Sequence, residues 1–161
     1  MTSVYFDTSV FLAILNAEPS AGAIRQLLGE LKSDRVRIYT SIITVQEVSV
    51  LAYRRGSAAI DPHVTVSRLA RIETITRDIA LMAAKYEALI VDAAHIKDHI
   101  ENRRRKWDCF HLATAVALGC KTFYALDEGF AKRKEQLNLA IDVRSPEPTK
   151  PRFSFMAEPP S

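Results

Sequence analysis

Short apolar runs that alternate with segments of helical period constrain the fold of this chain more than any other feature of its sequence. The runs are candidate β-strands, and between them apolar residues recur with the spacing of a buried helix face. Such alternation is typical of a parallel sheet with helices on both faces, so the sequence predicts an α/β fold. The expected strands are Val4–Phe6, Val36–Tyr39, Ile72–Ile75, Thr122–Leu126 and Ala140–Val143.

Residues suited to helix ends lie between these strands. The polar cluster Asp7-Thr8-Ser9 can cap a following helix, and Gly56 and Gly119 stand where helices should stop. The charged stretch Asp92–Lys106 is open to two interpretations, an extra helix or a loop. The expected helices are Val10–Leu15, a segment after Pro19, Ser41–Arg55, Thr76–Val91, Trp107–Leu118 and Glu128–Leu137.

The distribution of proline divides the chain into two parts. A chain of 161 residues with 48% hydrophobic content is long enough to bury one sizeable core. Most of the seven prolines lie between Pro146 and Pro160, a composition that disfavours regular structure. The sequence therefore predicts one domain over residues 1–145 and a proline-rich C-terminal tail over residues 146–161.

Cysteine usage and hydropathy bear on the compartment. Cys109 and Cys120 fall in one expected helix, where a disulfide between them is geometrically disfavoured, and free thiols are typical of the reducing cytosol. The N-terminus lacks a signal-peptide pattern, and no apolar run approaches the roughly 18 residues of a spanning helix. We therefore expect a cytoplasmic protein with no membrane partner. The formal charge of +3 is compatible with a polyanionic partner but does not require one.

Two carboxylates directly follow expected strands. Asp7 comes after the first strand, and Asp127 comes after the strand that ends at Leu126. Ligands of open parallel sheets collect at the carboxyl ends of the strands, so both side chains should emerge at one edge if these strands are neighbours. Taken singly, each aspartate is also explained as a helix cap.

Two further carboxylates lie on helix faces that are otherwise apolar. Glu47 shares its face with Ile43 and Leu51, and Asp108 shares its face with Leu112. Burying an ionised carboxylate without a partner costs several kcal/mol, so such groups are paired, protonated or bound to a cation. Because no lysine or arginine falls on either face, a bound cation is favoured.

Four clustered carboxylates would repel one another unless a divalent cation neutralised them. Hard oxygen ligands select Mg²⁺ or Mn²⁺, because a zinc site would use histidine or cysteine at characteristic spacing. A metal held in this way activates water for phosphodiester hydrolysis, which is nuclease chemistry, and phosphatase chemistry satisfies the same argument. A phosphatase of the haloacid-dehalogenase type, however, needs a second aspartate where this chain has Ser9.

Four segments, in this order along the chain, carry a family resemblance: Phe6–Ser9, Gln46–Val48, Asp108–Ala115 and Leu126–Phe130. Together they resemble the PIN-domain family and, within it, the VapC-type toxin ribonucleases. The most specific part is the helix with the pattern Asp-x-x-His-Leu-Ala-x-Ala, placed before a strand that ends in aspartate. The resemblance spans about residues 3–143 and implies a three-layer α/β/α sandwich with a central parallel β-sheet.

The resemblance also implies roles for individual residues. Asp7, Glu47, Asp108 and Asp127 would be the catalytic metal ligands for Mg²⁺ or Mn²⁺, and Ser9 would support them. The implied protein is an endoribonuclease that hydrolyses RNA, acts as the toxin of a type II toxin–antitoxin system, forms a homodimer and is inhibited by a cognate antitoxin. The alternative is a PIN-like domain that binds RNA or protein without cutting, although the presence of all four acids speaks against it.

Two departures from the family pattern stand out. Ala125 occupies a position where the family often has threonine, so one polar contact near the metal is missing. The charged stretch around Asp92 to Lys106 is longer than is usual in the family.

Basic residues near the expected site are candidates for RNA binding. One run lies just ahead of Asp108 and could contact phosphates, and a solvated charged surface is the alternative. The pair Arg54-Arg55 is a shorter candidate of the same kind. The run consists of Arg103, Arg104, Arg105 and Lys106.

Two neighbours of Asp108 are expected to have structural roles. His111 follows Asp108 by one helical turn and is expected to be a hydrogen-bonded packing residue rather than a ligand. Trp107 is expected to anchor its helix rather than to stack on a base.

Overall fold

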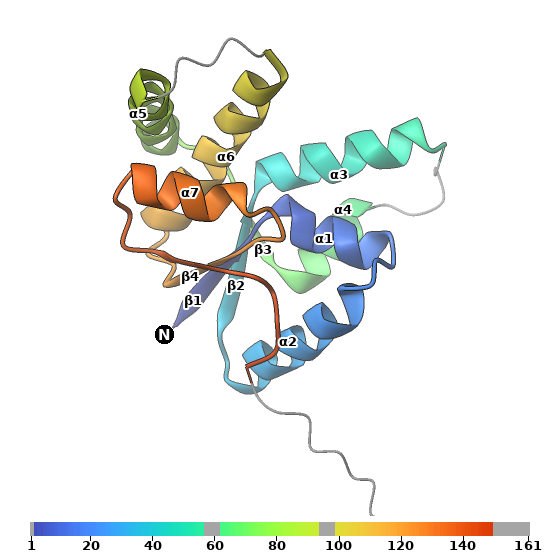
Figure 1. Ribbon diagram of the computed structural model, residues 1–161. Coiled ribbons are helices and arrows are strands. Elements are labelled where there is room, and N and C mark those ends of the chain that lie inside the picture. The colour runs from blue at the N-terminus through green and yellow to red at the C-terminus, as the bar shows by residue number, and fades with distance from the viewer. Residues whose placement is uncertain (1, 57–61, 94–98, 150–161) are drawn as a thin grey trace, which may run out of the picture.

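Five parallel strands form a single sheet in the order β3-β2-β1-β4-β5 (Figure 1). The computed structural model describes residues 2–56, 62–93 and 99–149, and for residues 91–93 and 99–104 it describes the backbone alone. This arrangement confirms the predicted α/β fold with a central parallel sheet. The strands are β1 (Ser3–Phe6), β2 (Arg37–Ser41), β3 (Arg71–Glu73), β4 (Thr122–Tyr124) and β5 (Asp142–Arg144).

Helices cover both faces of the sheet and complete the three layers (Figure 1). One face carries α1 (Thr8–Leu15), α2 (Ala21–Ser33), α3 (Ile42–Arg54) and α4 (Pro62–Leu69). The other face carries α5 (Arg77–Ala93), α6 (His99–Ala117) and α7 (Gly129–Gln136).

The central strand β1 contributes to the core on both sides of the sheet. Val4 and Phe6 belong to the hydrophobic core beneath the first helical layer, whereas Tyr5 belongs to the core beneath the second. This alternation follows from the two-residue period of a strand. Tyr5 stacks on Phe123 of β4, with ring centroids 5.0 Å apart, so the two central strands are locked together by an aromatic pair.

The charged stretch Asp92–Lys106 extends the helices on either side of it. The helix expected from Trp107 begins at His99, and α5 continues to Ala93. Residues 94–98 lie outside the described part of the chain. The helical interpretation of this stretch is therefore confirmed for residues 99–106, and the sequence left it open because charged positions lack the apolar period on which the prediction depended.

The chain after β5 runs back along α2. Pro146 is buried, and Thr149 donates two hydrogen bonds to Glu30, from its backbone nitrogen and its hydroxyl, both at 2.9 Å. Packing thus continues past residue 145, and the expected domain boundary stays a prediction. Cys109 and Cys120 are buried and unpaired with each other. Among the helices described, none has the length and apolar character needed to cross a membrane.

Candidate active site

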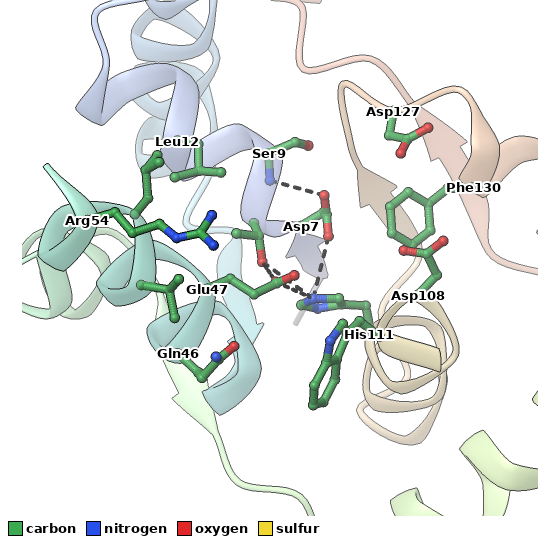
Figure 2. A pocket seen from close by; sticks show the side chains of 14 residues that line it. Asp7, Ser9, Leu12, Gln46, Glu47, Arg54, Asp108, His111, Asp127 and Phe130 are labelled. Carbon is green, nitrogen blue, oxygen red and sulfur yellow. Dashed lines mark hydrogen bonds and ion pairs between the residues drawn. The ribbon is translucent and has the colours of Figure 1, made fainter. Parts of the chain in front are cut away.

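All four predicted carboxylates line one pocket of about 580 Å³ (Figure 2). Asp7 follows β1, Glu47 lies on α3, Asp108 lies on α6, and Asp127 lies between β4 and α7. Because β1 and β4 are neighbours in the sheet, their carboxyl ends open at the same edge. The structure therefore brings these residues to one place, although they are far apart in the sequence.

Asp7 lies at the floor of the pocket and is almost fully buried, with 6% of its surface exposed. It caps α1, because its carboxylate accepts a hydrogen bond of 3.1 Å from the backbone nitrogen of Ser9. Burial raises the pKa of Asp7, and the nearby His111 and the hydrogen bonds from Ser9 counteract only part of that effect. The anionic form of the Asp7 carboxyl group is therefore only partly stabilised by the protein groups around it.

Ser9 joins the two central strands at the rim of the pocket. Its hydroxyl oxygen accepts a hydrogen bond of 3.0 Å from the backbone nitrogen of Leu126, in the segment that leads from β4 to Asp127. Ser9 thereby holds the Asp7 turn and the Asp127 segment in a fixed relation.

Glu47 is held by groups from two other helices. Its Oε2 accepts a hydrogen bond from the Thr8 hydroxyl and lies 3.2 Å from Nε2 of His111. Burial raises the pKa of Glu47, but the contacts with His111 and Thr8 outweigh burial, so the pKa is lowered. Glu47 is therefore an anion in this environment.

Asp108 forms a salt bridge with a residue that the sequence did not suggest as its partner. Arg133 of α7 places its Nε 2.6 Å from Oδ2 of Asp108. Burial nevertheless raises the pKa of Asp108 from 3.8 to about 6, against the lowering effect of Arg133. The search for a basic partner on the same helix face missed Arg133 because it comes from a different helix.

Asp127 acts as a turn residue as well as lining the pocket. Its Oδ1 accepts a hydrogen bond of 2.8 Å from the backbone nitrogen of Gly129, the first residue of α7. The side chain is exposed, unlike that of Asp7. Asp127 thus forms the turn before α7, whose N-cap is Glu128, and it also lines the pocket.

His111 contacts two of the carboxylates, which the sequence analysis did not anticipate. The residue is buried, with 2% of its surface exposed, and its Nδ1 lies 2.7 Å from the Tyr5 hydroxyl. Its Nε2 faces Glu47 and lies 3.6 Å from Oδ1 of Asp7 (Figure 2). Burial lowers the pKa of His111, but the two carboxylates outweigh burial and raise it. The one-turn spacing after Asp108 was the available signal for this position.

The carboxylates fit a hard divalent cation by their chemistry, but they do not form a finished coordination sphere. Across residues 2–56, 62–93 and 99–149, no three histidine, cysteine, aspartate or glutamate side chains stand close enough to hold one metal ion. Each of the four acids instead has a protein partner. Binding Mg²⁺ or Mn²⁺ would therefore require the carboxylates that line the pocket to move closer together.

The basic run ahead of Asp108 is not presented as one exposed surface. Arg105 is buried, with 4% of its surface exposed, whereas Lys106 is exposed. The side chains of Arg103 and Arg104 lie outside the described part of the chain. Burial of Arg105 removes it from contact with RNA in this conformation.

Several pocket residues were not singled out as site residues from the sequence. Trp107 lines the pocket and is 37% exposed, so anchoring its helix accounts for only part of its surface. Gln46 of α3 and Phe130 of α7 line it as well. Arg54 of α3 also lines it, and this residue was part of the Arg54-Arg55 pair that the sequence offered as a candidate for RNA binding. Only the folded arrangement of α3, α6 and α7 places them together.

Residues 4–136 match the family model of the PIN domain. The chain belongs to the PIN-domain family. The match covers most of the chain and confirms the resemblance that the four sequence segments indicated. No curated protein matches the chain.

Solved structures of VapC-type proteins have the same fold as this PIN-domain chain. The toxin VapC20 of Mycobacterium tuberculosis, described as cleaving the sarcin–ricin loop, is 21% identical, with a TM-score of 0.58 over 80% of this chain and 93% of that one. VapBC-1 of nontypeable Haemophilus influenzae is 14% identical, with a TM-score of 0.61 over 90% and 98%. VapBC2 of Rickettsia felis, bound to a promoter DNA fragment, is 13% identical, with a TM-score of 0.63 over 89% and 98%. At these identities the likeness establishes the fold.

Proposed function

We propose that this PIN-domain chain is a divalent-metal-dependent endoribonuclease that acts as the toxin of a type II toxin–antitoxin system. The observation that carries the proposal is that four carboxylates from separate elements line one pocket at the carboxyl edge of the sheet. Family membership supports it, because the same four residues stand in the segments that resemble VapC-type ribonucleases.

The residues that would hold Mg²⁺ or Mn²⁺ are Asp7, Glu47, Asp108 and Asp127. The bound ion would supply a water of lowered pKa and would stabilise charge that develops on the phosphate. Thr8 and His111 orient Glu47 through hydrogen bonds, and the Ser9 backbone fixes Asp7. Arg133 holds the Asp108 carboxylate in position through the salt bridge between them.

Partners follow from the same proposal. The substrate is RNA, the protein works in the cytoplasm, and it forms a homodimer. A cognate antitoxin is proposed because structures with this fold include toxin–antitoxin complexes, among them one from Klebsiella pneumoniae.

A second candidate is a PIN domain that binds RNA or a protein without cutting. The observation that favours it is that each of the four carboxylates is engaged by a protein group. It requires that the salt bridge between Asp108 and Arg133 persists when metal is present.

RNA cleavage with and without EDTA tests the proposal. We expect the parent chain to cut single-stranded RNA in Mg²⁺ or Mn²⁺ and to stop in EDTA. The variants Asp7→Asn and Asp108→Asn should each lose roughly a hundredfold or more of the rate, because a ligand should matter at least as much as the groups that support ligands.

The matched control is Asp142→Asn, which removes the same charge from β5, away from the pocket. Asp142 pairs with Arg144 and is 45% exposed. The Asp142→Asn variant should cleave RNA at the same rate as the parent. RNA binding without metal-dependent cutting would support the second candidate, and cutting by Asp7→Asn at the parent rate would overturn the mechanism.

A further inference from the structure

Arg54 is a cation in the pocket that lies on the same face of α3 as Glu47, which corrects the expectation that this face carries no arginine. Arg54 is the seventh residue after Glu47, which is about two helical turns, or roughly 10 Å along the helix axis. Figure 2 shows the guanidinium end of Arg54 pointing towards the centre of the pocket, between Leu12 and Glu47. Arg54 thus lies beside the carboxylates but farther out along α3.

Among the described residues, no protein group bonds to the guanidinium of Arg54. In the part of the chain that the structure describes, Arg54 makes neither a hydrogen bond nor an ion pair, although four carboxylates line the same pocket. Arg133 differs, because it is committed to Asp108. A guanidinium that points into a pocket with all its donors free is suited to a ligand rather than to holding the fold.

The neighbouring Arg55 provides a contrast. Its NH1 donates a hydrogen bond of 2.6 Å to Asn16, and it lines a separate pocket of about 100 Å³ that no carboxylate lines. Two adjacent arginines with the same charge therefore face different sites, and only Arg54 faces the carboxylates.

The chemistry of the surroundings favours a phosphate as the ligand. Leu12, Val50 and Leu51 line the same pocket as Arg54, and apolar groups of this kind can lie along the stem of an arginine while its head remains available. A guanidinium matches phosphate oxygens through two parallel hydrogen bonds. Its offset from Glu47 places it beside, and not on, the phosphate that the carboxylates would hold through a metal.

We infer that Arg54 is a substrate-binding residue that grips one non-scissile phosphate of the RNA strand. The inference rests on the proposed ribonuclease function and names the contact that fixes the strand in the site. Arg55 has no part in this contact.

RNA binding by a cleavage-deficient chain tests the inference. Full-length Asp108→Asn protein is titrated with a single-stranded RNA oligonucleotide at several salt concentrations, with Arg54→Ala or Arg55→Ala added. Arg54→Ala should weaken binding about tenfold, and it should reduce the slope of log K against log salt by about 0.7, the value for one phosphate contact on a single strand. Arg55→Ala should leave the affinity within twofold of the background and the salt slope unchanged, although it removes the same charge.

Substitution on the RNA locates the contact. A neutral methylphosphonate is placed at one linkage at a time, and one position beside the scissile linkage should weaken binding to the background protein. Arg54→Ala should be insensitive to that position, since the partner has already been lost. Thermal unfolding of each variant verifies that it folds.

Two results would overturn the inference while leaving the ribonuclease proposal intact. Either Arg54→Ala and Arg55→Ala have equal effects on affinity and salt slope, or Arg54→Ala remains sensitive to every methylphosphonate. If the background protein bound no RNA and the parent cut none, the ribonuclease proposal would fail together with the inference.

Discussion

The carboxylates of the pocket differ in how well their neighbours stabilise the negative charge. Burial disfavours the anionic forms of Asp7 and Asp108, whereas His111 and Thr8 stabilise the anionic form of Glu47. The protein groups of the pocket thus stabilise the charge of one carboxylate, Glu47, and leave the charges of Asp7 and Asp108 costly. A divalent cation would relieve both of the latter.

The pH dependence of stability should report on Asp108. Its pKa is raised from 3.8 to about 6 in the folded chain, so between these values the folded chain holds a proton that the unfolded chain has lost. Lowering the pH from 7 to 5 in EDTA should therefore raise the free energy of unfolding, with about 1 kcal/mol of the increase due to Asp108. Urea unfolding of the parent and of Asp108→Asn measures this difference.

The comparison isolates Asp108, because the other titrating groups are common to both proteins. The variant should lack that part of the pH dependence, while Asp142→Asn should retain it. A variant whose unfolding free energy follows the parent curve from pH 7 to pH 5 would show that Asp108 is not the strained carboxylate.

The sequence predicted which four acids form the site, but it could not predict the side chains that bond to them. Strand ends and apolar helix faces pointed to Asp7, Glu47, Asp108 and Asp127. The pairing of Asp108 with Arg133, and the position of His111 between Glu47 and Asp7, depend on how α3, α6 and α7 pack, which no local pattern encodes.

At the scale of elements, the turn at Gly119 sets the relation between α6 and β4. Gly119 has a φ of 65°, and the backbone nitrogens of Gly119 and Cys120 donate to the carbonyls of Val116 and Ala115, both at 3.0 Å. This is the Schellman pattern, in which glycine adopts a left-handed conformation after the last helical residue. It lets α6, with Asp108, pass directly into β4, which leads to Asp127.

Glycine-to-alanine substitutions should have opposite signs at two positions. Gly119→Ala should lower the free energy of unfolding by about 1 kcal/mol, because a side chain is strained at this φ. Gly29→Ala, inside α2 with open space around the new Cβ, should raise it by up to about 1 kcal/mol. Urea unfolding compares the two variants with the parent. A Gly119→Ala chain as stable as the parent would show that this turn does not require the left-handed conformation of glycine.

Helical and strand periods predicted most elements, with errors at their ends. The cap at Asp7 and the stop at Gly119 could be predicted because capping depends on local residue types, whereas Ser41, expected as the first residue of its helix, is the N-cap. The extension of α6 back to His99 was left open between a helix and a loop, since a charged run has no apolar period to decide between them.

At the scale of the whole molecule, the strand order creates the site. β1 lies between β2 and β4, so the helix that follows β2 and the turn that follows β4 both reach the carboxyl end of β1. The sequence predicted a parallel sheet, but the neighbouring positions of β1 and β4 were a condition of the site hypothesis. That condition is met by the pairing of Val4 with Thr122, Tyr5 with Phe123 and Phe6 with Tyr124.

The convergence of the four acids is useful for catalysis only if they hold a divalent cation together. Electron paramagnetic resonance of Mn²⁺ added to metal-stripped protein measures this binding directly, and Mg²⁺ should displace the Mn²⁺. We expect the parent and Asp142→Asn to bind Mn²⁺ alike, and Asp7→Asn and Asp108→Asn to bind it at least about tenfold more weakly. A parent chain that left all the Mn²⁺ free, or an Asp7→Asn variant that bound it as tightly as the parent, would contradict a shared metal site.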